Sequence, residues 1–228
     1  MGATGVILEM LRWLKHREGQ PAQDVYPPDT PLRSIRYVVL DTEFTSLDRR
    51  ANRLLSVGAV AMEGASIRMG EQFYRVLNPG VEVPKSTVLV HKLRPSDIEH
   101  GEPPFQVLAE LRDYIAGAVL VGHFVKLDVD LLRKELRATE HSLDNPAVCT
   151  AQVHRWLLRK GRYSEDLYHR LENVDLASLA KIYEIEFREA HHALDDAFVT
   201  ARLWQKLIYK LEAHSIRTLQ DLLNICTP

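Results

Sequence analysis

Four ionisable side chains crowd into one short stretch, HHALDDA at residues 191–197. Histidine exchanges a proton near neutral pH and carboxylates bind divalent cations, so this composition suits proton transfer or metal binding. On a helix, Asp196 borders the apolar side, whereas Asp195 points about 100° away from it. His191 falls in the turn that leads into the helix. We therefore expect Asp196 to face inward; the alternative is a solvated helix start with incidental histidine caps.

A second pair of acids ends the β-branched run IRYVVLDTE. Asp41 and Glu43 are two residues apart on a predicted strand, so both side chains leave the same face. They lie at the carboxyl end of that strand, the edge at which ligands bind in open α/β sheets. Adjacent carboxylates repel each other unless a cation neutralises them, and oxygen ligands suit Mg²⁺ or Mn²⁺. Alternatively, the pair merely ends a strand in a chain with 31 acidic residues.

A further acid, Asp128, begins a leucine-rich helix directly after the apolar run VLVGH. Helical spacing puts Asp128 on the side of Leu131 and Leu132, about 200° from Asp130. Asp128 is therefore the better candidate for an inward-facing acid. Simple pairing of its charge with the helix dipole is the alternative.

The elements that must position these acids follow from hydrophobic periodicity. Strands are predicted at 35–43, 53–63, 66–77, 118–123 and 146–150, with Gly64 in a turn. Helices are predicted from Pro104, at 127–136, 150–158, 175–184 and 193–211, and near 216–225, with a polar surface loop or short helix at 159–173. Three meandering strands followed by alternating helices and strands predict an α/β fold with a mixed central sheet flanked by helices.

Apolar side chains recur at helical spacing in three of these helices, and those of the long helix are expected to form an inward stripe. They are Phe105, Leu108, Leu111 and Ile115 in the first; Leu127, Leu131 and Leu132 in the second; and Ala193, Ala197, Ala201, Trp204 and Ile208 in the long helix.

Composition limits the class of protein and its surroundings. The chain has 228 residues, a net charge of −2 and two cysteines, Cys149 and Cys226, which are too few for a disulfide framework. No run approaches the roughly 18 apolar residues of a membrane span, so we expect a cytoplasmic protein without a membrane partner. We expect three regions: an amphipathic helix (6–17) and proline-rich linker within 1–33, a main domain at 34–212, and a helical tail at 213–228.

Three segments, in order, resemble the motifs of a known enzyme family. DTEF, GHFVKLD and HHALDDA look like the three exonuclease motifs of the DEDD superfamily, and the last resembles its histidine-containing branch. That branch includes the proofreading epsilon subunit of bacterial DNA polymerase III, and the resemblance covers about residues 36–211. It implies a ribonuclease H-like fold. It also implies a metal-dependent 3′–5′ exonuclease, a phosphodiester hydrolase that releases nucleoside 5′-monophosphates from nucleic-acid 3′ ends, with single-stranded DNA favoured.

The resemblance also implies roles for individual residues. Asp41, Glu43, Asp128 and Asp196 would bind two divalent cations, Mg²⁺ or Mn²⁺, and His191 would be the general base. Residues expected to contact substrate are Thr42, Phe44, Thr45, Leu47 and His91. Phe44 could instead be a core aromatic, and His91 a loop histidine bonded to backbone.

Two positions depart from the family pattern. Phe124 follows His123 where the family usually has asparagine, and Leu127 replaces a common phenylalanine. These changes leave the acids intact but alter sugar and base contacts, and we expect His123 to be structural. Candidate cationic contacts for nucleic acid are Arg155, Arg159, Arg49, Arg50, Arg53 and Lys126, although such side chains often form only a solvated face.

Other functions fit parts of the same pattern. The alternatives are an RNA-trimming exoribonuclease of the same family, a non-catalytic polymerase partner or nucleic-acid-binding module, and a metal phosphatase acting on small phosphoesters. A role in DNA repair or replication, with a DNA polymerase as a partner, follows from the resemblance alone. QDLLNI at 220–225 is better explained by an amphipathic helix than by a sliding-clamp peptide. The helix at 6–17 could dock, dimerise or bind a partner, and we predict that it is not catalytic. The sequence leaves the oligomeric state open.

Overall fold

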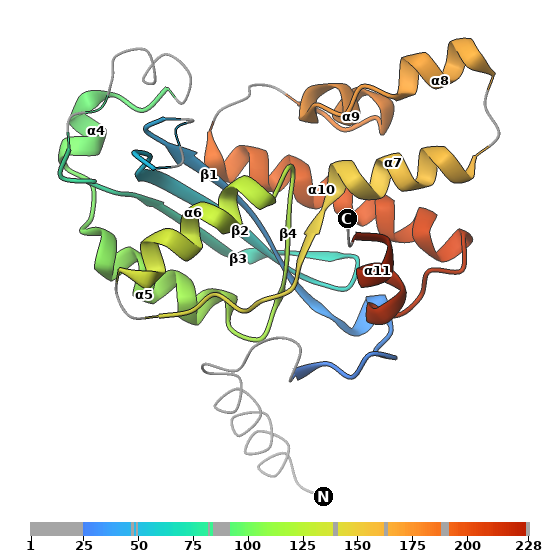
Figure 1. Cartoon of the computed structure of the whole chain (residues 1–228), viewed down its shortest axis with the longest axis horizontal. Coiled ribbons are helices and arrows are strands. Elements are labelled where there is room, and N and C mark those ends of the chain that lie inside the picture. The colour runs from blue at the N-terminus through green and yellow to red at the C-terminus, as the bar shows by residue number, and fades with distance from the viewer. Residues whose placement is uncertain are drawn as a thin grey trace, which may run out of the picture.

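A five-stranded mixed sheet forms the centre of the protein in a computed structural model (Figure 1). The structure describes residues 25–46, 48, 50–81, 83, 92–138, 141–161, 164–187 and 192–226. The strands are β1 (Arg36–Phe44), β2 (Leu54–Glu63), β3 (Ser66–Val76), β4 (Val119–Gly122) and β5 (Ala147–Cys149), in the spatial order β3-β2-β1-β4-β5. β1 pairs antiparallel with β2 and parallel with β4. The predicted α/β class and all five predicted strands are confirmed.

The helices follow the predicted order, with two short additions. They are η1 (Leu32–Ser34, a 3-10 helix), α4 (Pro95–Glu99), α5 (Pro104–Ile115), α6 (Lys126–Arg137), α7 (Thr150–Lys160), α8 (Glu165–Leu171), α9 (Leu176–Ile182), α10 (Ala193–Ala213) and α11 (Leu219–Cys226). η1 and α4 were not expected from the periodicity. α8 is the short helix allowed for in the polar stretch 159–173.

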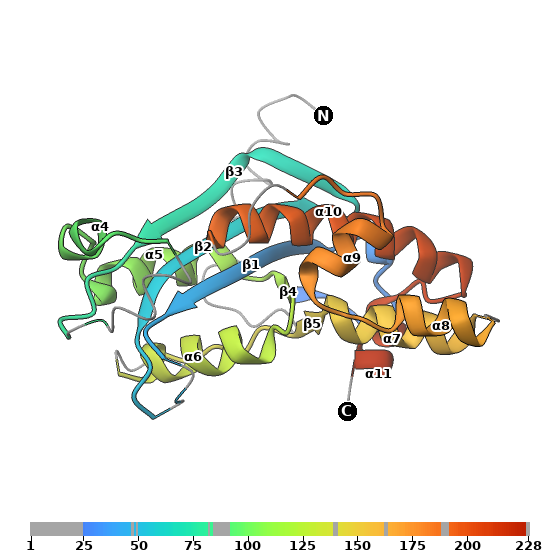
Figure 2. The ribbon, with the colours of Figure 1, turned by 90° about the horizontal axis from the view of Figure 1, so that it is seen from above.

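Helices cover both faces of the sheet (Figure 2). This burial on both faces explains why the sequence of β1 is a continuous apolar run. Tyr37 and Val39 face α7, α10 and α11, whereas Val38 and Leu40 face α5 and α6. A strand buried on both faces does not alternate between apolar and polar residues. The predicted inward stripe of α10, from Ala193 to Ile208, is fully buried.

Two of the apolar side chains at helical spacing are exposed. Phe105 is 67% exposed and Leu127 is 41% exposed, each in the first turn of its helix. Helical spacing gives the angular position of a side chain around the axis. It does not say how far along that axis other elements cover the helix, so an apolar side chain in the first turn can remain exposed.

Segments on either side of the predicted main domain pack against its core. Tyr26 and Leu32 join Leu219 and Leu222 of α11 in one buried cluster. The N–H of Leu32 donates to the carbonyl of Arg217 at 2.9 Å. The predicted linker is therefore packed from residue 25 onward, because its apolar side chains meet those of α11. The domain limits at 33 and 213 stay predictions.

Two further expectations concern a helix near the start of the sequence and membrane-spanning helices. The predicted helix at 6–17 lies outside the described residues. Among the helices that the structure describes, none has the length and apolar character needed to cross a membrane.

Candidate active site

Three acids from distant parts of the chain meet beside the carboxyl end of β1. Asp41 and Glu43 leave β1 on the face covered by α10, and Asp196 comes from the first turn of α10. One carboxylate oxygen from each lies within 4.8 Å of the others. Asp196 is buried, while Asp195 is exposed, as the helical spacing predicted. The sheet edge and the helix start therefore build a compact set of oxygen ligands.

Asp128 reaches this edge from the opposite face of the sheet. It lies in the first turn of α6 and is buried, as predicted. Its Oδ1 accepts hydrogen bonds from the backbone N–H of Thr42 at 3.0 Å and from the Thr42 hydroxyl at 2.6 Å. Thr42 stands between Asp41 and Glu43 on β1, so it fixes Asp128 next to that pair. Asp128 is nevertheless not one of the three acids whose oxygens lie within 4.8 Å.

The acids raise one another's pKa values. Burial raises the pKa of Glu43 to about 7, and the negative charges of Asp196 and Asp128 add to the effect. Part of Asp41 is exposed, but desolvation of its carboxyl group raises its pKa well above the ordinary value. The negative charges of Asp128, Asp196 and Glu43 raise it further. Burial also raises the pKa of Asp128, against the lowering effect of the Thr42 hydrogen bond. Crowded, desolvated carboxylates lack the positive charge that would stabilise their ionised forms.

A divalent cation fits this donor set. Carboxylate oxygens are hard ligands of the kind that Mg²⁺ and Mn²⁺ prefer, and the ion's charge would relieve the repulsion that raises these pKa values. Asp41, Glu43 and Asp196 would hold the first ion, with Asp128 alongside.

The predicted substrate contacts are only partly within the described residues. Phe44 is half-buried and packs against the apolar cluster shared by α5 and α6. The Thr45 N–H donates to the carbonyl of Arg53 at 3.0 Å, and its hydroxyl accepts from the Arg53 N–H at 2.9 Å. The backbone N–H and the hydroxyl of Thr42 both donate to Asp128. Their substrate roles stay predictions.

Three of the residues predicted to contact substrate or act as the base lie outside the described part of the chain. They are His191, His91 and Leu47.

His123 has a structural environment, as predicted. Its Nδ1 lies 2.9 Å from the Thr150 hydroxyl, and burial lowers its pKa to about 4. Phe124, the departure from the family pattern, has a positive φ of 56° and is 41% exposed.

The predicted cationic contacts form no single group. Arg155 and Arg159 are exposed on α7. Lys126 pairs with Asp130 at 3.3 Å, and Arg53 lies 3.7 Å from Glu135. Arg50 is exposed, and Arg49 lies outside the described residues.

Two residues that the sequence reasoning passed over lie beside the acids. Gly58 of β2 pairs with Asp41, and a Cβ at Gly58 would lie 2.2 Å from the backbone nitrogen of Leu194. A glycine inside a strand can mark such a close backbone approach, so the sequence did carry this signal. Tyr74 of β3 pairs with Gly58 from the other side, and its ring contacts His192. No local pattern indicates that contact.

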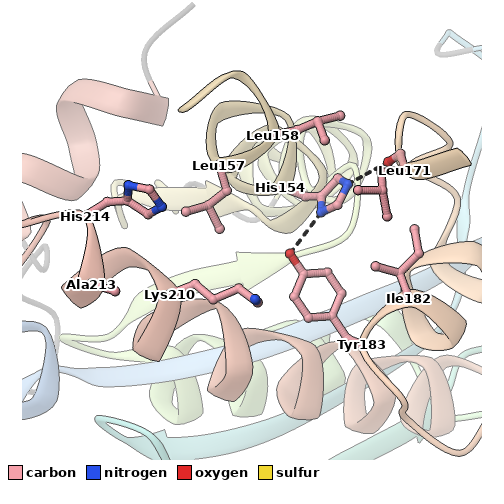
Figure 3. A pocket seen from close by; sticks show the side chains of 9 residues that line it. All are labelled: His154, Leu157, Leu158, Leu171, Ile182, Tyr183, Lys210, Ala213 and His214. Atoms are coloured by element: carbon pink, nitrogen blue, oxygen red, sulfur yellow. Dashed lines mark hydrogen bonds between the residues drawn. The ribbon is translucent and has the colours of Figure 1, made fainter. Parts of the chain in front are cut away.

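A separate cavity of about 380 Å³ lies between α7, α9 and α10 (Figure 3). Both nitrogens of His154 in its wall have partners: Nδ1 lies 2.9 Å from the Tyr183 hydroxyl and Nε2 lies 2.8 Å from the Leu171 carbonyl. None of the four acids lines this cavity. The histidine is therefore part of the packing and not of the acidic site.

Comparison with known proteins decides the family. The sequence model of the exonuclease family, RNase T, matches residues 38–204, from β1 into α10. The chain belongs to the exonuclease family. The resemblance based on the three motifs is thereby confirmed, and the mixed sheet is the ribonuclease H-like arrangement that it implied.

Proteins similar to this exonuclease-family chain include two that carry the name DNA polymerase III. DNA polymerase III PolC-type of Clostridium perfringens is 26% identical over 190 residues, which are 81% of this chain and 12% of that protein. DNA polymerase III subunit epsilon of Aquifex aeolicus is 26% identical over 177 residues, which are 77% of this chain and 81% of that protein. The chain thus spans about an eighth of the first relative and most of the second.

A solved structure shows the same fold. E. coli exonuclease I, in complex with a dT13 oligonucleotide, superposes with a TM-score of 0.67 at 16% identity. The match covers 79% of this chain and 42% of exonuclease I.

Proposed function

We propose that this protein is a metal-dependent 3′–5′ exonuclease. It hydrolyses phosphodiester bonds at nucleic-acid 3′ ends, with single-stranded DNA favoured, and releases nucleoside 5′-monophosphates. The observation that carries the proposal is the convergence of Asp41, Glu43 and Asp196 within 4.8 Å in a chain of the exonuclease family. E. coli exonuclease I, which shares the fold, is known in complex with a dT13 oligonucleotide, and this supports the choice of single-stranded DNA.

The acids hold the reaction's cations in this proposal. When bound, two divalent cations, Mg²⁺ or Mn²⁺, supply charge that stabilises the transition state and lowers the pKa of the attacking water. Asp41, Glu43 and Asp196 would ligate one of them. Asp128, whose Oδ1 accepts hydrogen bonds from Thr42, would contribute its other oxygen to the second. Four carboxylates then carry enough negative charge to balance both ions, so a phosphodiester can approach without strong repulsion.

His191 accepts the proton of the attacking water. This role rests on its position in HHALDDA, five residues before Asp196. A histidine with a pKa near neutral pH can take the proton without adding negative charge beside the phosphate. Phe44, Thr45, Leu47, Thr42 and His91 are proposed to surround the terminal nucleotide, with Phe44 contacting its base.

The proposed protein partner follows from the similar proteins, and the proposed compartment follows from the cysteines. Two of the similar proteins are named as DNA polymerase III components, so a DNA polymerase is the proposed protein partner. The cytoplasm is the proposed compartment, where Cys149 and Cys226 can remain the free thiols that the structure shows.

A labelled oligonucleotide tests this function. Single-stranded DNA with a 5′ label, incubated with Mg²⁺ or Mn²⁺, should shorten stepwise from its 3′ end while mononucleotides accumulate. Chelation of the metal should stop the reaction. Competition with matched RNA and duplex substrates ranks the substrate preferences. If RNA is cleaved faster than DNA, RNA is the preferred substrate.

Two results would overturn the proposal. Binding of oligonucleotides without release of any nucleotide, with either metal, would identify a non-catalytic binding module. Turnover of small phosphoesters without shortening of oligonucleotides would identify a phosphatase.

A further inference from the structure

The start of α10 rests directly on the backbone of β2. A Cβ at Gly58 would lie 2.2 Å from the nitrogen of Leu194 and 2.5 Å from the carbonyl oxygen of Ala193. Gly58 pairs with Asp41 on one side and with Tyr74 on the other, so these three residues form one row across the sheet. Residues directly opposite each other on neighbouring antiparallel strands project from the same face. The helix start therefore lies over glycine, with a carboxylate and a tyrosine on its two flanks.

Both flanks of this row contact the first turn of α10. On the Asp41 side, Asp196 of the helix joins the acidic group. On the Tyr74 side, the tyrosine ring lies against the ring of His192, with centroids 4.7 Å apart and planes tilted by 31°. The carbonyl of His192, the N-cap residue, accepts the hydrogen bond from the Asp196 N–H at 3.0 Å. A shift of His192 is thus transmitted to Asp196 through one backbone hydrogen bond.

The ring contact has a particular importance at this helix start. Among the described residues, the N-cap side chain makes no capping hydrogen bond to the first turn of α10. Glycine offers no side chain to stop the helix from sliding along the sheet. Offset aromatic contacts have a preferred geometry, so the Tyr74 ring can fix the lateral position that Gly58 leaves open.

Tyr74 also lies close to the acids. Burial raises its pKa, and the charges of Asp97, Asp195 and Glu43 add to that effect. The hydroxyl group stays neutral at neutral pH, so Tyr74 brings an aromatic surface to the site without a further negative charge.

We propose that Tyr74 is a positioning residue, which by stacking on His192 holds the first turn of α10 over Gly58 and so places the Asp196 carboxylate against Asp41 and Glu43. The proposal rests on the exonuclease function proposed above. Tyr74 acts through the position of Asp196 and does not itself bind metal or substrate. Its ring is what matters, and its hydroxyl group is dispensable.

Tyr74→Phe and Tyr74→Ala separate the ring from the hydroxyl. Tyr74→Phe should keep kcat within about twofold, whereas Tyr74→Ala should lower kcat by about tenfold or more with KM nearly unchanged, because misplacing a group by a fraction of an ångström slows the chemical step. His192→Ala should have the same effect as Tyr74→Ala. The double variant should be no slower than the slower single variant, because both remove the same ring contact. His192→Ala also removes the contact between His192 Nδ1 and Asp195 Oδ2 at 3.4 Å, so Tyr74→Ala is the cleaner test of the ring.

Two further measurements do not depend on catalysis. Mn²⁺ titration of the protein without nucleic acid should show weaker binding in Tyr74→Ala and His192→Ala. Amide hydrogen exchange should become faster in residues 193–196 and stay unchanged at the far end of α10. Tyr209→Ala is the matched control: Tyr209 lies near the far end of α10, is 55% exposed and contacts Arg33 instead of the first turn.

The outcomes separate positioning from other roles. A rise in KM alone in Tyr74→Ala would make Tyr74 a substrate contact and overturn the proposal. A lower melting temperature with unchanged kcat and exchange would make it a purely structural residue, and this too would overturn the proposal. Equal losses in Tyr74→Phe and Tyr74→Ala would overturn the role of the ring. If Tyr74→Ala does not fold, His192→Ala removes the same ring contact from the side of α10.

Failure of the proposed exonuclease function can be distinguished from failure of the positioning role of Tyr74. If the wild-type protein releases no nucleotide, faster exchange in residues 193–196 of Tyr74→Ala would still support the positioning role. Unchanged exchange there would overturn it, whatever the activity of the wild-type protein.

Discussion

Ionisable groups are buried in two regions of this protein, and the two differ in how their polar atoms are satisfied. In the cavity between α7, α9 and α10, both nitrogens of His154 have partners, and burial lowers its pKa so that the ring stays neutral. At the end of β1, burial and neighbouring charges instead raise the pKa of Asp41 and Glu43. Burial is common to both regions. Crowding of like charges is found at the acids, and it distinguishes a functional site from a packed core.

Removing one carboxylate at the acidic site should have the largest effect. Asp196→Asn retains the shape of the side chain but removes the charge that would hold a cation. We expect exonuclease activity to fall by roughly 1000-fold, equivalent to about 4 kcal/mol of transition-state stabilisation. The melting temperature of the metal-free protein should stay the same or rise, because a repulsive charge is gone. Single-turnover rates with Mg²⁺ and a thermal melt measure the two effects. Activity near the wild-type level would remove Asp196 from the site.

Gly58→Ala tests whether close packing of the helix start is specific to the acidic region. The added methyl group would overlap the backbone of Ala193 and Leu194, so α10 must move away from β2. We expect a loss of about 1–3 kcal/mol in the free energy of unfolding from overpacking. Activity should fall by about 100-fold, because a displacement near 1 Å at a reacting group has that effect. Denaturant unfolding and steady-state kinetics measure both. Gly70→Ala is the control, since nothing lies within 4 Å of its added methyl group.

The pH dependence of stability should reveal the crowded carboxylates. The pKa of Glu43 is raised from 4.5 to about 7, so between these values the folded protein binds more protons than the unfolded chain. Unfolding free energy is therefore lost as the pH rises through this range. The metal-free protein should melt at a higher temperature at pH 5 than at pH 7.5, and Glu43→Gln should weaken this dependence. Mg²⁺ should stabilise the wild type more at pH 7.5, where the carboxylates are ionised. An identical pH profile in Glu43→Gln would contradict the assignment.

The smallest effect is expected in the other region. Tyr183→Phe removes the hydroxyl partner of His154 Nδ1 without changing the shape of the cavity wall. We expect a loss of about 1 kcal/mol in the free energy of unfolding and no change in exonuclease activity. A substantial loss of activity in this variant would show that the His154 region takes part in the function after all.

Particular residues show how far prediction from sequence reached. Helical spacing correctly separated Asp196 from Asp195, and Asp128 from Asp130, because the rotation per residue in a helix is fixed. The same rule does not give the exposure of Phe105 and Leu127, which depends on where neighbouring elements end. The segment from residue 25 was predicted as a linker, because its proline content is visible in the sequence and its contact with α11 is not.

The sequence by itself determined the elements, the side of each element on which the acids lie, and the family through three motifs. These properties depend on residues that are near one another in the chain. The tertiary structure alone decided that Thr42 holds Asp128, that α10 rests on Gly58, and that Tyr74 contacts His192. Each of these contacts joins segments that are far apart in the sequence, and its geometry follows from strand register and close packing in three dimensions.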